Sequence, residues 1–394
     1  MTALSYYVAI SGSRRGLLWC YIINEHSKEA AHFELVNAST SHDILLLTPI
    51  IIDSWNVAKR AENAGWRPWT VTLTANCMMS RVTENWTQIY FYIYWRRPSG
   101  PPPTPPEGLE RIWVQTPGGK IEILSAKPAH PTSNTPVVFA HGGMGCAWMW
   151  TPYMRYLAER GVSCYAISTR GHGNSWHPSF LRMLYTVTKR DLGDDLIAGI
   201  EAVREKEGSE VILVGHSSGG GLSQFLLHEG NIKVKGLALL SAVPGTGSRA
   251  FFSEDYPEVE LLEFQRHLNR YESFLWPFGM LLPFVDAKKL LQNITGWGAS
   301  ERLLIMAGTA DKMMTKNIQE KAANTYRIAF SELVKDKKLE AKDEEVRSLA
   351  GEGDMDNSGR GVRLAWVPGA GHHLQNDVMW EIGAEKLLAF LQQL

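Results

Sequence analysis

The stretch VILVGHSSGGG, residues 211–221, determines the fold expected for this chain. It begins with four apolar, strand-favouring residues and ends with three consecutive glycines. Gly215 to Gly219 match the pattern G-x-S-x-G, in which a strand enters a sharp turn and a helix leaves it, so that the serine hydroxyl stands clear of the backbone. Residues 222–228 predict the start of that helix. This context favours Ser217 as a nucleophile over a glycine-rich turn without chemistry.

The composition is that of an ordinary soluble globular protein. Of the 394 residues, 44% are hydrophobic and 21% are charged. The length allows one large α/β domain with additional material, or two domains. The formal net charge of -1 argues against nucleic acid or an anionic membrane as a partner. The four cysteines lack metal-ligand spacing and are too few for a disulfide scaffold. We therefore expect a cytoplasmic protein without metal or stable membrane insertion; the sequence does not indicate its oligomeric state.

The pattern of the chain changes at a proline-rich stretch. Residues 1–97 contain apolar runs without a sustained helical or strand period, and their fold is not predicted. Residues 98–107, which include PSGPPPTPP, cannot continue a helix or a sheet and predict a stiff linker. The regular pattern occupies residues 108–394, which we expect to form the main domain.

Short apolar runs alternate with helical patterns through most of this domain. A hairpin is predicted at 110–126, and strands at 137–140, 162–168, 211–216, 236–241, 302–307 and 362–367. Helices are predicted at 149–160, ending at Gly161, at 187–207, ending at Gly208, and at 316–334 and 378–394. Residues 335–361 are rich in charge and glycine and predict a solvated excursion. The alternation predicts a mostly parallel sheet with helices on both faces.

The alternation is interrupted between about residues 244 and 299. This stretch shows no clear strand and is dense in aromatic residues and methionine, which predicts a helical cap inserted over the sheet edge. Such a cap buries some aromatic side chains in its own core and offers others to a ligand. The candidate substrate-binding residues are Phe252, Phe274, Trp276 and Met280.

A serine hydroxyl needs an adjacent base and a carboxylate that orients this base. Histidine suits the role of the base because its side-chain pKa lies near 7. His372 follows the last predicted strand through a Pro-Gly-Ala-Gly loop, and we prefer it to His373. Asp311 follows the strand at 302–307 and is preferred as the carboxylate, because the loop after Ser241 offers none. The competing carboxylates are Glu254, Asp255 and Asp286, and the other histidines in glycine-rich positions are His141, His172 and His216.

Acyl transfer also needs backbone N–H groups that face the developing oxyanion. We expect one from Ser218, which follows the candidate nucleophile. The second is expected from the loop HGGMG at 141–145, with Gly143 as the first candidate and Met144 as the alternative.

Together these segments resemble the α/β-hydrolase superfamily in its lid-bearing esterase, lipase and thioesterase branch. The resemblance covers residues about 108–394 and rests on His141-Gly-Gly, on RGHGNS at 170–175, on GHSSG at 215–219, on GTAD at 308–311 and on Gly371-His372. The order serine, aspartate, histidine is the order of that superfamily. Ser168 departs from the pattern, because the family often has aspartate two residues before the Arg-Gly pair; this departure concerns loop packing. The aromatic cap is also similar to caps of hydrolases in specialised metabolism.

The resemblance implies a serine hydrolase that cleaves an ester or thioester of a hydrophobic small molecule through an acyl-enzyme, with no metal or organic cofactor. Two alternatives stay open. An acyltransferase on the same scaffold would use an alcohol or amine in place of water. A ligand-binding protein could keep the fold and signal through its cap, although it would not need the set Ser217, Asp311 and His372.

Overall fold

The computed structural model divides into two compact units, Met1–Ser99 and Gly100–Leu394. In the first unit it describes the backbone of five strands. In the second it describes residues 100–243, 268–269, 272–273, 275, 284–298, 301–349 and 355–394. The four candidate substrate-binding residues (Phe252, Phe274, Trp276 and Met280) and most of the predicted cap lie outside the described residues.

The five strands of the first unit form one sheet in the order β3-β2-β1-β4-β5. Their bounds are β1 Tyr6–Gly12, β2 Leu18–Asn24, β3 Ala30–Leu35, β4 Val71–Leu73 and β5 Phe91–Ile93. The strands β1 and β2 pair antiparallel along their full length, whereas β1 and β4 are parallel. The sequence pattern had given no fold for this segment.

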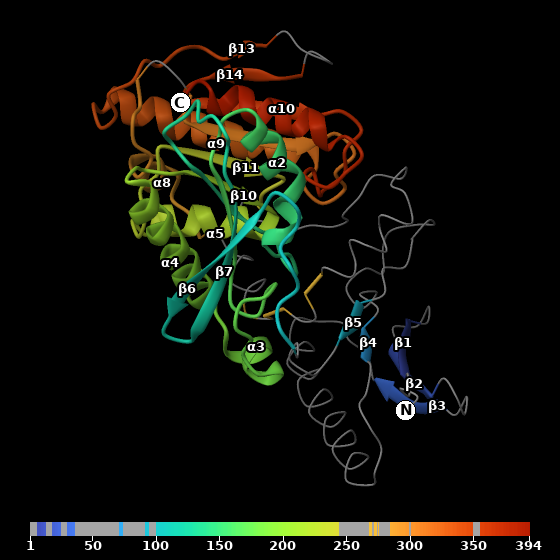
Figure 1. Cartoon of the computed structure of the whole chain (residues 1–394). Coiled ribbons are helices and arrows are strands. Elements are labelled where there is room, and N and C mark those ends of the chain that lie inside the picture. Colours follow the sequence, from blue (N-terminus) through green and yellow to red (C-terminus); the bar gives the residue numbers. More distant parts are fainter. Residues whose placement is uncertain are drawn as a thin grey trace. The chain divides into compact units, whose positions relative to one another are not determined.

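The described strands of the second unit form a ten-stranded sheet in the order β13-β14-β15-β12-β11-β10-β8-β9-β7-β6 (Figure 1). Its six central strands are parallel: β8 Val137–Ala140, β9 Cys164–Ser168, β10 Ile212–His216, β11 Gly236–Leu240, β12 Leu303–Gly308 and β15 Val362–Val367. Nearly every residue in them is buried, as expected for strands covered on both faces. The hairpin β6 Glu110–Thr116 and β7 Gly119–Ala126 is confirmed and closes one edge antiparallel.

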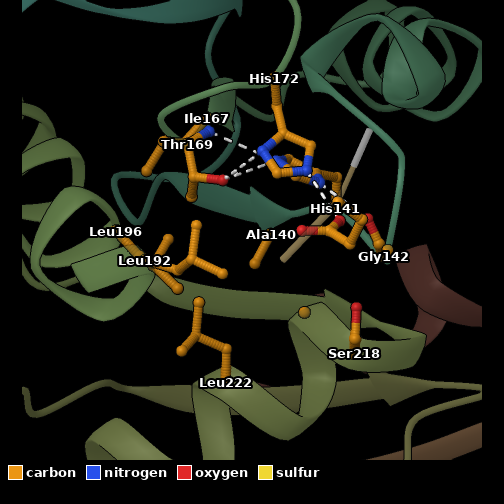
Figure 2. A pocket seen from close by; sticks show the side chains of 13 residues that line it. Ala140, His141, Gly142, Ile167, Thr169, His172, Leu192, Leu196, Ser218 and Leu222 are labelled. Carbon is orange, nitrogen blue, oxygen red and sulfur yellow. Dashed lines mark hydrogen bonds and ion pairs between the residues drawn. The ribbon is translucent and has the colours of Figure 1, made fainter. Parts of the chain in front are cut away.

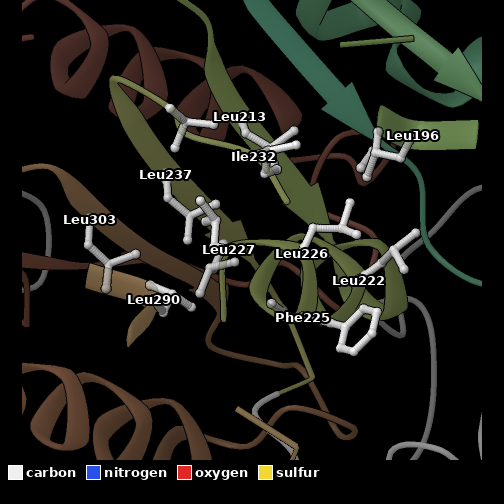
Figure 3. Close-up of a cluster of buried hydrophobic side chains, with 14 of the residues drawn as sticks. Leu196, Leu213, Leu222, Phe225, Leu226, Leu227, Ile232, Leu237, Leu290 and Leu303 are labelled. Carbon is white, nitrogen blue, oxygen red and sulfur yellow. The ribbon is translucent and has the colours of Figure 1, made fainter. Parts of the chain in front are cut away.

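Helices cover both faces of this sheet and create two apolar cores. Along β10 the side chain of Leu213 enters the core formed with α4 Lys189–Glu207, α5 Ser217–His228, α8 Ala287–Gln292 and α9 Lys316–Lys335 (Figure 3). Its neighbours Ile212 and Val214 enter the core formed with α2 Thr151–Glu159 and α10 Trp380–Leu391. This alternation confirms that β10 lies in the middle of three layers.

Two helix ends follow directly from the sequence. The helix α4 begins with a capping box, in which Thr188 and Asp191 satisfy each other's backbone N–H groups. It ends at Gly208, whose φ of 64° is the left-handed conformation that glycine adopts without strain. Gly161, which follows α2, has a φ of 90° and confirms the predicted end of that helix.

The structure adds elements that the sequence pattern does not predict. A short helix, α3 Phe180–Thr186, precedes α4, and a 3-10 turn at Ala147–Trp150 precedes α2. The charged excursion after α9 is largely exposed, but it also contains the short strands β13 Arg347–Ser348 and β14 Asn357–Gly359. These pair antiparallel and extend the sheet beyond β15. Among the described residues, no helix is both long and apolar enough to cross a membrane.

Candidate active site

Ser217 lies at a strained turn between β10 and α5. Its φ of 48° is unusual for a residue with a side chain. The turn is close-packed: a Cβ on Gly215 would lie 2.6 Å from the Cα of Gly220, and a Cβ on Gly219 would lie 2.2 Å from the carbonyl oxygen of His141. Gly215 and Gly219 are therefore required by contacts with backbone atoms, which cannot move aside as a side chain can.

The three residues predicted for the chemistry lie in one hydrogen-bonded chain. The Oγ of Ser217 is 2.9 Å from Nε2 of His372, and Nδ1 of His372 is 3.0 Å from Oδ2 of Asp311. All three are buried. They come from the ends of β10, β12 and β15, whose parallel alignment brings their carboxyl ends to the same edge of the sheet.

Asp311 is held as a carboxylate by its surroundings. Its second oxygen, Oδ1, accepts the N–H groups of Met313 and Met314, both at 2.8 Å. Burial by itself would raise the pKa of the Asp311 carboxyl, but the hydrogen bond and charge of His372 and the amide of Met314 keep this pKa below its ordinary value. An ionised carboxylate accepts the Nδ1–H of the imidazole, which leaves Nε2 to face the serine.

The neighbouring histidines have other positions. His216 lies with Nε2 2.9 Å from the carbonyl oxygen of His372, so this nitrogen must carry the proton and donate it. The ring of His373 packs on His216, with centroids 4.4 Å apart. Burial, reinforced by the charge of His372, lowers the pKa of His216 to about 3, and burial also lowers the pKa of His373. Both are therefore neutral supports near neutral pH, and it is His372 that contacts Ser217.

The loop after β8 forms a tight turn beside Ser217. The N–H of Gly145 donates to the carbonyl oxygen of Gly142 at 3.1 Å, and Met144 within the turn has a φ of 57°. The N–H of Met144 donates to Oε2 of Glu272 at 2.9 Å. Within the described part of the chain, the N–H groups of Gly143 and Ser218 make no hydrogen bond. Of the two candidates in this loop, the structure therefore favours Gly143 as the donor that is open to a ligand.

A small cavity of about 20 Å³ lies next to this turn (Figure 2). Its apolar wall consists of Ala140, Ile167, Leu192, Leu196 and Leu222, and its polar wall includes His141, Thr169, His172, Ser218 and Glu272. In Figure 2 Leu192 and Leu196 come from the helix at the left and Leu222 comes from the helix at the bottom, whereas His172 enters from above. A cavity of this volume holds about one water molecule.

Ser168 stands where the resemblance led us to expect an aspartate, and the carboxylate at this place comes from Glu122 instead. This buried residue of β7 accepts hydrogen bonds from Ser168 Oγ at 3.2 Å and from the backbone N–H and side-chain amide of Asn174 at 3.0 and 2.7 Å. It also pairs with Arg111 at 2.6 Å. Four donors thus converge on one carboxylate, so the loop at 170–175 keeps its anchor, although the acidic residue comes from a neighbouring strand. A charged residue inside the otherwise apolar run 121–124 was the signal for it in the sequence.

Comparison with known proteins agrees with this architecture. A model of the alpha/beta hydrolase family matches residues 137–381. Similar solved structures include a monoglyceride lipase from Saccharomyces cerevisiae, at 13% identity, with 75% of this chain and 99% of that chain covered and a TM-score of 0.52. They also include a carboxylesterase from Bacillus subtilis (19% identity, 73% and 92% covered, TM-score 0.48) and an esterase from Exiguobacterium antarcticum (18% identity, 71% and 98% covered, TM-score 0.49). Because the family match spans well over half of the sequence and agrees with the parallel sheet described above, the chain belongs to the alpha/beta hydrolase family.

Proposed function

We propose that this protein is a serine hydrolase that cleaves esters of hydrophobic small molecules through an acyl-enzyme. The observation that carries the proposal is the continuous chain from Ser217 Oγ through the His372 imidazole to the Asp311 carboxylate, with contacts of 2.9 and 3.0 Å. A nucleophile, a base and an orienting carboxylate in this geometry can perform acyl transfer.

In the first step, Ser217 Oγ attacks the ester carbonyl carbon while its proton moves to Nε2 of His372. The imidazolium that forms is stabilised by Asp311, to which it donates through Nδ1. The negative charge on the former carbonyl oxygen is accepted by the N–H groups of Gly143 and Ser218. When the tetrahedral intermediate collapses, Nε2–H protonates the leaving oxygen, and the acyl group remains on Ser217.

In the second step, a water molecule replaces the alcohol. Nε2 of His372 takes its proton as the water oxygen attacks the acyl carbon, and the same proton then returns to Ser217 as the acid leaves. No metal or organic cofactor is required for either step. A thioester would follow the same course with a thiol as the leaving group.

The expected substrate is apolar because of the composition of the inserted segment. The sequence between 244 and 299 is rich in aromatic residues and methionine, which predicts apolar surface at the same sheet edge.

The proposal is tested with a fluorophosphonate probe and p-nitrophenyl esters. The wild-type protein should be labelled and should hydrolyse the esters, whereas Ser217→Ala should lose labelling and lose at least about 10⁴-fold in kcat. His373→Ala, whose imidazole packs on the ring of His216, is the matched control and should remain labelled. Full turnover by Ser217→Ala would reject the proposal. Adding an acceptor alcohol to the same assay distinguishes hydrolysis from acyl transfer to an alcohol.

A further inference from the structure

Glu272 belongs to the inserted segment between β11 and β12, yet its carboxylate is bound to the oxyanion loop. Oε2 accepts the N–H of Met144 at 2.9 Å and lies 2.9 Å from Nε2 of His172. Oε1 accepts the N–H of Ser273 at 2.9 Å. Within the same segment, the N–H of Asn269 donates to the carbonyl oxygen of Met144 at 2.7 Å. Both backbone polar groups of Met144 are therefore held by the insertion.

The protons in this contact can be counted from its geometry. Nδ1 of His172 lies 2.9 Å from the carbonyl oxygen of Arg170, which can only accept, so Nδ1 carries a proton. Nε2 faces the carboxylate of Glu272, which already accepts the N–H of Met144 on the same oxygen. The arrangement is satisfied when the imidazole carries both protons and the carboxylate is ionised.

The pKa values agree with this ion pair. Burial by itself would raise the pKa of Glu272, but the charge and hydrogen bond of His172 and the two backbone amides lower it to about 2. Burial would lower the pKa of His172, but Glu272 and the carbonyl oxygen of Arg170 raise it above its ordinary value. The positive charge of His172 also offsets a carboxylate charge that would otherwise oppose an oxyanion nearby.

The contact acts on the turn that presents Gly143. With a φ of 57°, Met144 is in a conformation that a residue with a Cβ adopts only when its surroundings hold it there. The carboxylate occupies the N–H of Met144, whereas the N–H of Gly143 makes no hydrogen bond among the described residues. A Cβ built on Gly143 would lie 3.5 Å from Ser218 Oγ and 4.0 Å from Glu272 Oε2, so Glu272 and the start of α5 flank the same point of the loop.

We propose that Glu272 is a positioning residue: by binding the Met144 amide with His172 as its counter-ion, it fixes the turn in which Gly143 offers its N–H to the oxyanion. This inference rests on the proposed function, since it concerns the oxyanion donors of the same reaction. It implies that the insertion contributes to the reaction itself as well as to substrate binding.

The test uses the full-length protein and a trifluoromethyl ketone, which forms an oxyanion with the serine and so reports on the donors. In Glu272→Ala we expect the Ki of this inhibitor to rise about 10- to 100-fold in parallel with a fall in kcat, while KM changes less than about threefold. The amount of active enzyme is set by fluorophosphonate titration. Glu272→Gln keeps the shape of the side chain and should give a smaller rise, of about five- to tenfold, and it decides the question if the alanine variant does not fold.

Ser273→Ala is the matched control. Its Oγ donates to the carbonyl oxygen of Val187 at 2.5 Å, so the substitution loosens the same segment but keeps the Glu272 carboxylate and the Ser273 N–H that binds it. Its Ki should stay within about threefold of the wild type. A Ki that is unchanged in both Glu272 variants would overturn the positioning role, as would an equal rise in Ser273→Ala. Failure of the proposed function is distinct, because Ser217→Ala would then keep its turnover whatever the Glu272 variants do.

Discussion

Substitution of Ser168, whose hydroxyl binds the carboxylate of Glu122, tests how the 170–175 loop is anchored. Glu122 Oε2 lies 3.2 Å from the Ser168 hydroxyl. Ser168→Asp would place a second buried carboxylate beside the first. At a separation of about 3.5 Å and an effective dielectric constant of about 20, two unit charges repel by about 5 kcal/mol. We expect the variant to lose about 3–5 kcal/mol in the free energy of unfolding at pH 7, since Arg111 offsets only part of this repulsion.

The matched control is Ser168→Asn, which has almost the same shape as the aspartate variant but no charge. Urea denaturation at pH 7 and at pH 5 measures the difference between the two. It should shrink at the lower pH, because protonation of the introduced aspartate removes the charge that distinguishes it from asparagine. Adding Glu122→Gln to Ser168→Asp should recover at least about 2 kcal/mol in the free energy of unfolding. The double variant has a single carboxylate, on residue 168, which can anchor the loop without a second charge beside it. If the aspartate and asparagine variants agree within about 0.5 kcal/mol, the reasoning is refuted.

Other expected outcomes concern packing, pH, substrate and domain boundaries. Gly219→Ala should reduce kcat by about 100-fold, because its Cβ would push α5 away from the oxyanion loop, whereas the Cβ of Gly298→Ala meets no atom of the described residues within 4 Å and this variant should match the wild type in the same assay. Burial lowers the pKa of His141 and of His216 to about 3, so both imidazoles stay neutral in the folded protein, whereas in the unfolded chain they take up protons below about pH 6.5. The free energy of unfolding should therefore fall as the pH falls, by about 2–3 kcal/mol per histidine at pH 4.5. Denaturation at pH 7.5 and at pH 4.5 would measure this loss. Activity on p-nitrophenyl esters should rise from acetyl to medium-chain acids, by up to about fourfold per CH₂ group, and a flat series would mean that the aromatic residues of the insertion do not line the site. A chain that begins at Pro105 should fold and keep the proposed esterase activity; insolubility of this shorter chain, with the full chain soluble, would contradict the predicted boundary.

The sequence predicts those parts of the structure that depend on local pattern. Buried parallel strands appear as short apolar runs, and the residues that follow them, Ser217, Asp311 and His372, can be placed at one sheet edge from strand order alone. Contacts between distant segments leave no such trace. Glu272 and Met144 are 128 residues apart, and nothing in either neighbourhood indicates the other. The strand β14 was missed because only pairing with β15 defines it in a polar, glycine-rich stretch.

The position of β15 as the last strand along the chain has a consequence for how activity is acquired during refolding. His372 follows β15 and reaches a serine that is 155 residues earlier in the chain. Contacts of such sequence separation form late, because a long loop must close before they gain any stabilisation. A partly refolded chain with β8 to β12 assembled could show helical and strand signals and still bind no fluorophosphonate. The recovery of turnover therefore reports when the last parallel strand joins the sheet. A delay between the recovery of the circular dichroism signal and the recovery of turnover would measure that step.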